Sequence, residues 1–185
     1  MRRIIINILI IIFIYTTTYS QPCPDSLKIL PNFINFGQKA PDSSRKIDVI
    51  ILHSSFCPER ADSFALPCIL NLYKKYDVSA HYIITREGVV HQLVNEAIIS
   101  FHGGKGILPD GRQTINTSSI GIELINSYTG IYTDLQYCCL SKLVKNIQQR
   151  YKINHIVCHS DVAPLRKTDP WNFDWLRFWN MIQEE

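Results

Sequence analysis

The sequence lacks a strong excess of either charge. Its 185 residues carry a formal net charge of +3, and loss of Arg2 and Arg3 with the N-terminal segment described below would lower it to +1. The remaining lysines and arginines are scattered, so we expect ordinary solvated surface and no nucleic-acid partner. Low-complexity tracts and internal repeats are also missing. With 46% hydrophobic residues, the chain is predicted to form one globular domain with a proper core.

The chain has no apolar run long enough to cross a membrane stably. Residues 4–15 are apolar apart from one asparagine, whereas a span needs about 20 residues. This run follows a basic start and precedes the small residues Thr18 and Ser20, a pattern typical of a signal peptide cleaved before Gln21. We therefore expect export to the periplasm or the medium. An uncleaved anchor is the alternative.

The chain divides into three parts on this interpretation. Residues 1–20 are expected to be the signal peptide, residues 21–45, which contain four prolines, an extended lead-in, and residues 46–185 the functional domain.

Six cysteines are present, and in an exported protein an even number favours disulfides. Cys57 and Cys68 are the best local pair, because a bond between them closes a short loop. The sequence does not indicate how Cys23, Cys138, Cys139 and Cys158 pair. Cys158 is expected to be a core cysteine, since in a strand it would face away from His159.

Strand and helix patterns are interspersed along the domain. Strands are expected at 47–53, 119–125 and 155–159, with a hairpin of 81–84 and 89–94 around the turn Arg86-Glu87-Gly88. Helices are expected at 62–76, at 172–182, and from a capping box at Thr133 and Gln136 onward. Long loops are expected at 101–113 and 160–170. The predicted fold is α/β, a central mixed β-sheet flanked by helices in a single domain.

Two histidines with metal-binding chemistry each end one of these strands, and an aspartate of the same kind lies in the loop after the second. His53 ends an apolar strand, and His159 and Asp169 lie close together further on. Strand ends gather ligands in sheets of this kind, and three protein ligands plus water are typical of a catalytic zinc site. Taken singly, His53 could be a core histidine and Asp169 a turn cap, so spacing alone leaves both interpretations open.

Two further residues could complete a hydrolytic site. Glu123 lies on the opposite side of its strand from Ile120, Ile122 and Leu124, and a carboxylate beside a metal-activated water is the usual general base. Lys167 could stabilise an oxyanion. An ordinary outward-facing glutamate and a solvated lysine are the alternatives. Asp161 could orient His159 or merely cap the loop.

Five sequence blocks resemble the zinc-dependent N-acetylmuramoyl-L-alanine amidases of the amidase type 2 family, relatives of the peptidoglycan recognition proteins. The blocks are Ile-Leu-His-Ser at 51–54, Ser-Ala-His-Tyr-Ile-Ile at 79–84, Phe-His-Gly-Gly at 101–104, Asn116 with Ser-Ile-Gly-Ile-Glu-Leu-Ile-Asn at 119–126, and Cys-His-Ser-Asp-Val-Ala-Pro-Leu-Arg-Lys-Thr-Asp-Pro at 158–170. The aspartate at position 169 resembles the residue found there in the AmpD/AmiD-like branch of the family.

The resemblance implies roles for the candidate residues. His53, His159 and Asp169 would bind one Zn²⁺, Glu123 would activate the water, and Lys167 would stabilise the transition state. The substrate would be peptidoglycan or a muropeptide, cut between N-acetylmuramic acid and L-alanine by a monomeric enzyme whose zinc amidase domain is residues 46–185. The blocks place His81, His102 and Asn116 at the substrate cleft.

The sequence departs from the family at the cleft wall. Leu165 replaces an expected glycine, Trp171 lies in an altered turn, and no tryptophan precedes Phe101-His102. Other functions also stay open: a non-catalytic peptidoglycan recognition protein, a zinc peptidase that cuts within the stem peptide, or a structural secreted domain.

Overall fold

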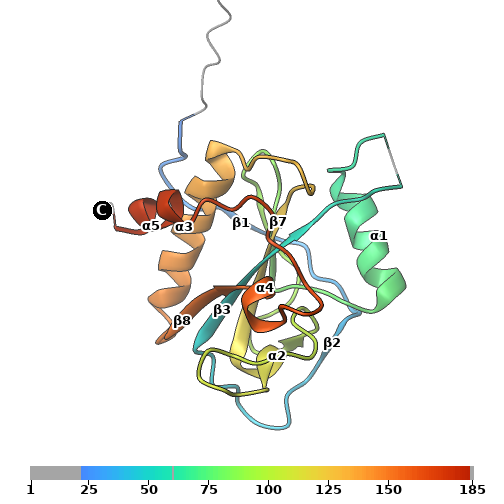
Figure 1. The fold of residues 1–185 in the computed structure, drawn as a ribbon, viewed down its shortest axis with the longest axis vertical. Coiled ribbons are helices and arrows are strands. Elements are labelled where there is room, and N and C mark those ends of the chain that lie inside the picture. The colour runs from blue at the N-terminus through green and yellow to red at the C-terminus, as the bar shows by residue number, and fades with distance from the viewer. Residues whose placement is uncertain (1–21, 60, 184–185) are drawn as a thin grey trace, which may run out of the picture.

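A mixed six-stranded sheet organises the molecule (Figure 1). The computed structural model describes residues 22–59 and 61–183; the expected signal peptide lies outside this part of the chain. The strand order is β1-β5-β4-β7-β3-β8, in which only the β4–β5 pair is antiparallel. β2 and β6 form a separate antiparallel pair. The predicted fold class is confirmed.

The elements follow one another along the chain with these bounds: β1 Ile29–Pro31, β2 Gln38–Lys39, β3 Val49–Ser55, α1 Leu66–Tyr76, β4 Tyr82–Ile84, β5 Val90–Gln92, β6 Ile99–Ser100, α2 Ile115–Ser118, β7 Ser119–Ile125, α3 Asp134–Gln148, β8 His155–Cys158, α4 His159–Val162 and α5 Trp175–Gln183.

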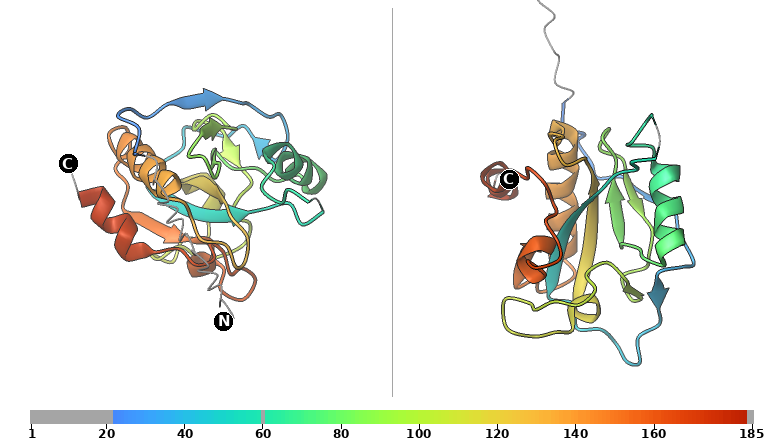
Figure 2. Two further views of the ribbon diagram at one scale, coloured as in Figure 1. Left: turned by 90° about the horizontal axis from the view of Figure 1, so that it is seen from above. Right: turned by 45° about the vertical axis from the view of Figure 1, so that its right-hand side comes forward.

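The register of β3 against β7 determines which of their residues share a face of the sheet. The strands run parallel with His53 opposite Glu123, and alternate residues face opposite sides. Ile120, Ile122 and Leu124 belong to the core cluster that packs on α3, as their alternation predicts. His53 and Glu123 therefore share the other face, which α1 and α4 flank (Figure 2).

Helix α3 begins where the capping box predicts. The backbone N–H of Gln136 donates to Thr133 Oγ1, and the N–H of Thr133 donates to Gln136 Oε1, both at 3.1 Å. Such reciprocal bonds satisfy two donors that a helix start leaves unpaired. The buried face of α3, with Leu140, Leu143 and Ile147, packs on the sheet beside Phe178 of α5.

Several predicted boundaries are wrong by a few residues. The first helix begins at Leu66 rather than Asp62, with Pro67 in its first turn, and the last begins at Trp175 rather than Asn172, whose φ of 57° is left-handed. The last strand ends at Cys158, so His159 begins α4 instead of ending a strand. The carboxylate of Asp161 accepts a hydrogen bond from the Cys158 N–H at 2.8 Å, which turns the chain into the helix. This contact supports the capping alternative for Asp161.

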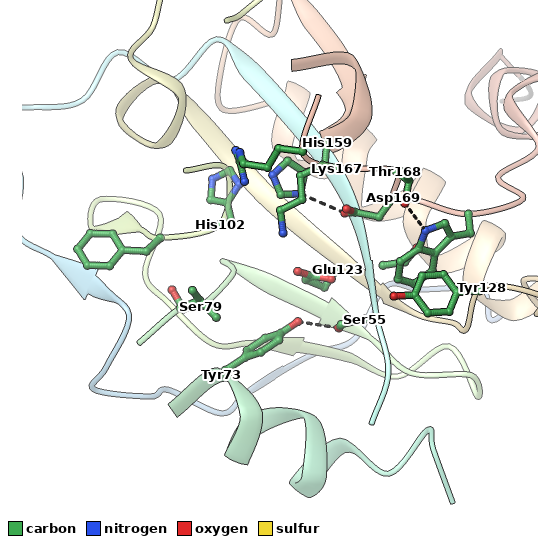
Figure 3. A pocket seen from close by; sticks show the side chains of 15 residues that line it. Ser55, Tyr73, Ser79, His102, Glu123, Tyr128, His159, Lys167, Thr168 and Asp169 are labelled. Carbon is green, nitrogen blue, oxygen red and sulfur yellow. Dashed lines mark hydrogen bonds and ion pairs between the residues drawn. The ribbon is translucent and has the colours of Figure 1, made fainter. Parts of the chain in front are cut away.

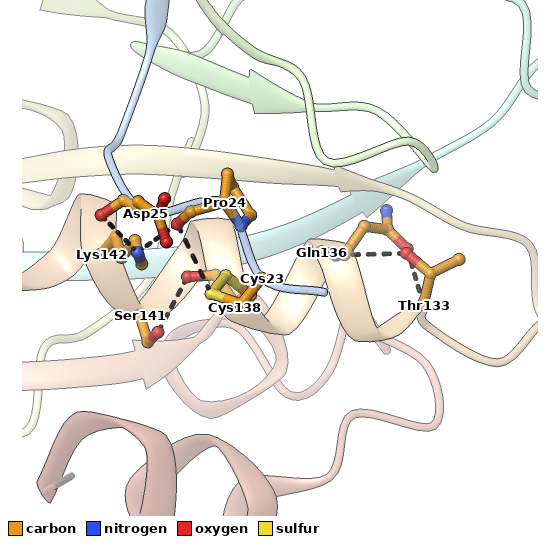
Figure 4. Close-up of a disulfide and its surroundings, with 8 residues drawn as sticks. All are labelled: Cys23, Pro24, Asp25, Thr133, Gln136, Cys138, Ser141 and Lys142. Atoms are coloured by element: carbon orange, nitrogen blue, oxygen red, sulfur yellow. Dashed lines mark hydrogen bonds between the residues drawn. A yellow bond between two sulfur atoms is a disulfide. The ribbon is translucent and has the colours of Figure 1, made fainter. Parts of the chain in front are cut away.

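Residues 22–45, the described part of the expected lead-in, are more integrated into the fold than a lead-in would be. From this segment, β1 adds an edge strand to the sheet, and Cys23 forms a disulfide with Cys138 of α3 (Figure 4). The ammonium group of Lys142 donates to the carbonyls of Pro24 and Asp25. Covalent and hydrogen bonds thus fasten the first described residues to α3.

The predicted Cys57–Cys68 disulfide is present. Cys139 and Cys158 are buried and free, so Cys158 is the core cysteine that the sequence predicts. None of the helices in the described part of the chain is long and apolar enough to cross a bilayer.

Removal of the Cys23–Cys138 bond should destabilise the protein more than removal of Cys57–Cys68. The bonds join residues 115 and 11 positions apart, and loop-closure entropy predicts losses of about 5 and about 3 kcal/mol. Chemical unfolding of the two double-alanine variants would measure this difference. Equal losses would contradict the loop-length explanation.

Candidate active site

A pocket of about 370 Å³ lies on the face of the sheet that carries His53 and Glu123. Its lining includes Glu123 of β7, His159 of α4, and Lys167 and Asp169 of the following loop (Figure 3). Residues distant in the sequence therefore meet at one hollow of the surface.

Three potential metal ligands converge at this pocket. The Nδ1 atoms of His53 and His159 are 2.9 Å apart, and Asp169 Oδ2 lies 3.1 Å from His159 Nδ1 and 3.5 Å from His53 Nδ1. The three side chains are buried. In the described part of the chain they form a group that could hold a metal ion.

The spacing of these atoms fits a zinc ion. Zinc bonds of about 2.0–2.1 Å in a tetrahedron place neighbouring ligand atoms about 3.3 Å apart, and the three observed distances bracket that value. Two neutral imidazoles and one carboxylate would leave a bound Zn²⁺ with residual positive charge. The donor set therefore fits the metal that the sequence predicts.

Hydrogen bonds prepare His159 to be a ligand. Its Nε2–H donates to the carbonyl of Gly103 at 3.1 Å, and a carbonyl can only accept. In the neutral ring Nδ1 then carries the lone pair, which points toward His53 and Asp169. Such outer hydrogen bonds fix the tautomer of metal-binding histidines.

Electrostatics also favour ligation. Burial lowers the pKa of His53 to about 4, so its imidazole is neutral near pH 7. Burial alone would raise the pKa of Asp169, but the adjacent His159 and His53 rings outweigh it and hold that pKa well below its usual range. The site thus presents one carboxylate and a neutral His53 ring to a cation.

Glu123 lies at the pocket with unused hydrogen-bonding capacity. It is 8% exposed, and its Oε2 has no hydrogen-bond partner among the described residues. Burial, followed by the charge of Asp169, raises its pKa to about 8, while hydrogen bonds with Ser55 and Tyr73 act in the opposite direction. A buried acceptor without a partner is costly, which marks Oε2 as a group available to bind water or substrate.

Lys167 follows the short α4 helix on the loop that also supplies Asp169. Its partly buried side chain points into the pocket on the side of Glu123 (Figure 3). An ammonium group at this position can stabilise negative charge that develops on a bound carbonyl.

The structure corrects part of the expected substrate cleft. His102 lines the pocket, but His81 does not: it is fully buried, and its Nδ1 accepts a hydrogen bond from the Gly121 N–H at 3.0 Å. Asn116 faces a different hollow, where its Oδ1 accepts from the Gly103 N–H at 2.7 Å. Both residues hydrogen-bond to the backbone beside the site, and neither lines the pocket.

Sequence reasoning missed several residues around the pocket. Tyr73 bonds to Ser55 Oγ at 2.7 Å, yet it lies in an apolar helical stripe that reads as core. Arg45, within the expected lead-in, donates to the backbone carbonyls of residues 96, 98, 116, 117 and 119, and no pattern indicates this. Tyr128 and Trp171 form an aromatic pair with centroids 4.3 Å apart; the altered turn at Trp171 was the one available signal.

The stability of the metal-free protein should depend on pH through Glu123. A carboxyl group whose pKa rises from 4.5 to about 8 on folding stabilises the fold fully below pH 4.5, and this contribution is lost as pH rises through 8. The slope from one group is at most about 1.4 kcal/mol per pH unit.

Unfolding with chelator present, repeated from pH 5 to 8, would measure this effect. Glu123→Gln should flatten the decline, whereas parallel curves for the variant and the wild type would show that Glu123 does not titrate in this range.

Comparison with known proteins places the pocket in a family context. The family model described as N-acetylmuramoyl-L-alanine amidase matches residues 43–172. The chain is 41% identical over 104 residues to the 1,6-anhydro-N-acetylmuramyl-L-alanine amidase AmpD of Citrobacter freundii, which covers 55% of each protein. The chain spans a little over half the length of the curated relatives it matches first.

Solved structures share the fold. A crystal structure of AmpD matches with a TM-score of 0.73 at 29% identity, over 86% of this chain and 96% of that one. A complex of the amidase AmiD from Escherichia coli with the substrate anhydro-N-acetylmuramic acid-L-Ala-D-gamma-Glu-L-Lys matches with a TM-score of 0.64 at 28% identity, over 77% of this chain and 60% of that one.

Proposed function

Since the chain belongs to the N-acetylmuramoyl-L-alanine amidase family, we propose that it hydrolyses the amide bond between N-acetylmuramic acid and L-alanine in peptidoglycan or muropeptides. The observation that carries this proposal is the convergence of three metal-binding side chains with Glu123 in one pocket. The family relatives include AmiD, whose complex contains a muropeptide fragment.

Zinc is the proposed cofactor, held by His53, His159 and Asp169. When bound, it supplies Lewis acidity that polarises a carbonyl and acidifies a water molecule. A cation at this position also favours the ionised form of Glu123 over the neutral one.

The remaining steps fall to residues of the chain. Glu123 accepts a proton from the water that attacks the amide carbonyl carbon, and Lys167 stabilises the negative charge on the carbonyl oxygen. As the C–N bond breaks, Glu123 returns the proton to the leaving nitrogen. The products are the lactyl carboxylate of muramic acid and a stem peptide with a free L-alanine amine.

The site is complete within one chain, which supports a monomeric enzyme. We propose residues 46–185 as the zinc amidase domain. Export is also proposed, with residues 1–20 as signal peptide: two disulfides in the described residues suggest an oxidising compartment. The mass of the protein recovered from the producing cells would test cleavage before Gln21.

Defined muropeptides with reducing and with 1,6-anhydro muramic acid would test the activity. The protein from Gln21 onward retains all described residues and would be incubated with each, with and without a zinc chelator. Mass spectrometry should show intact stem peptides that begin with L-alanine, and chelator should abolish their release. Cuts within the stem would instead indicate a zinc peptidase. Tight binding without cleavage in the presence of zinc would indicate a recognition protein.

A further inference from the structure

His102 lies behind the metal cluster in a space that a glycine provides. A Cβ atom at Gly121 would lie 2.4–2.8 Å from three atoms of the His102 ring, closer than packed atoms can approach. The ring is nearly buried, and its two nitrogens face His53 on one side and Ser119 on the other. His102 is therefore held in one orientation between two hydrogen-bonding groups.

The Ser119 hydroxyl fixes the direction of these hydrogen bonds. The Ser119 hydroxyl donates its one proton to the Ile115 carbonyl at 2.6 Å, because a carbonyl can only accept. Ser119 Oγ must then accept from His102, whose Nε2 lies 3.2 Å away. The proton of the His102 ring accordingly resides on Nε2.

The His102 ring in turn contacts the proposed metal ligand His53. The buried His102 ring has its proton on Nε2, where Ser119 Oγ accepts it, so its Nδ1 is an acceptor. The Nε2–H of His53 donates to that Nδ1 at 3.0 Å. His53 Nδ1 is therefore left with a lone pair, and this is the atom that faces His159 and Asp169.

We propose that His102 is a positioning residue for the metal site. The relay Ile115–Ser119–His102 fixes the tautomer and the ring orientation of His53, and thereby sets the affinity of the site for zinc. This role differs from contact with substrate, and it rests on the proposed function for the identity of the metal. Loss of such an outer partner typically lowers metal affinity 10–100-fold.

Zinc affinity, measured by competition with a chromophoric chelator, would test the relay in the protein from Gln21 onward. His102→Leu removes the acceptor and should weaken zinc binding 10–100-fold. His102→Asn places its Oδ1 near the position of Nδ1 and should restore affinity to within a few-fold of the wild type. His91→Leu, on strand β5 between β1 and β4, is the matched control and should leave affinity unchanged.

A second variant and a spectroscopic readout cover the case in which His102→Leu does not fold. Ser119→Ala removes the anchor of the relay and should also weaken zinc binding. In the zinc-bound wild type, ¹⁵N NMR should show His102 protonated at Nε2 and His53 protonated at Nε2.

Several outcomes would overturn the proposal. Wild-type affinity in both His102→Leu and Ser119→Ala would show that the relay does not act on the metal. Equal losses in His102→Leu and His102→Asn would point to packing alone, and a proton on His102 Nδ1 would reverse the relay. Failure of the wild type to bind zinc or to release stem peptides would instead count against the proposed function.

Discussion

Glu123→Gln should lower kcat for muropeptide hydrolysis by about 10²–10⁴-fold, the range for loss of a general acid–base group. Glutamine keeps the size of the side chain but cannot accept the proton of the attacking water. The expectation rests on the position of Glu123, opposite His53 in the sheet and beside the metal cluster. Steady-state assays at saturating zinc and muropeptide would measure the change.

Two controls give this result its meaning. Glu87→Gln alters an exposed glutamate in the hairpin turn and should leave kcat unchanged. Glu123→Gln should still be stabilised by zinc, because the variant retains all three proposed ligands. A variant that retains most of its activity would remove Glu123 from the mechanism.

Asp169→Ala should abolish both hydrolysis and the response to zinc. It removes the only carboxylate of the ligand set, so two neutral rings remain to hold a divalent cation. Loss of an outer-shell partner costs up to about 100-fold in affinity, and loss of a direct ligand should exceed that.

Thermal unfolding with and without zinc would measure the effect. Zinc at about 1,000 times its Kd should stabilise the wild type by about 4.1 kcal/mol, and Asp169→Ala should show no comparable gain at the same concentration. Asp42→Ala, a change at an exposed aspartate, should respond like the wild type. An undiminished zinc response in Asp169→Ala would exclude this aspartate as a ligand.

The sheet was predictable from sequence because its central strands have simple periodicities. The nearly continuous apolar run before His53 and the alternation around Glu123 both reflect burial that the structure confirms. The capping box of Thr133 and Gln136 likewise encodes a local interaction, so two positions three residues apart suffice to recognise it. Such patterns can be recognised from the sequence because the residues that interact are close together in it.

The support of the site was not predictable, because it depends on contacts between distant segments. Tyr73 looks like any apolar helix residue until α1 packs beside β3 and β7. Arg45 lies 51–74 positions from the carbonyls it binds. His81 was assigned to the cleft by its sequence block, whereas tertiary packing buries it completely. Spacing along the chain carries little information about such pairs.

The register between β3 and β7 has a consequence for how this protein could diversify. The first ligand and the candidate base are held at adjacent positions of paired parallel strands, so backbone hydrogen bonds between strands about 4.8 Å apart fix their separation. Arg166, Thr168 and the aromatic pair Tyr128 and Trp171 border the same pocket without belonging to the sheet. Mutation can therefore remodel substrate choice there while the reaction chemistry is inherited intact. Directed evolution toward new wall fragments should accordingly accumulate changes at those residues and spare the two strands.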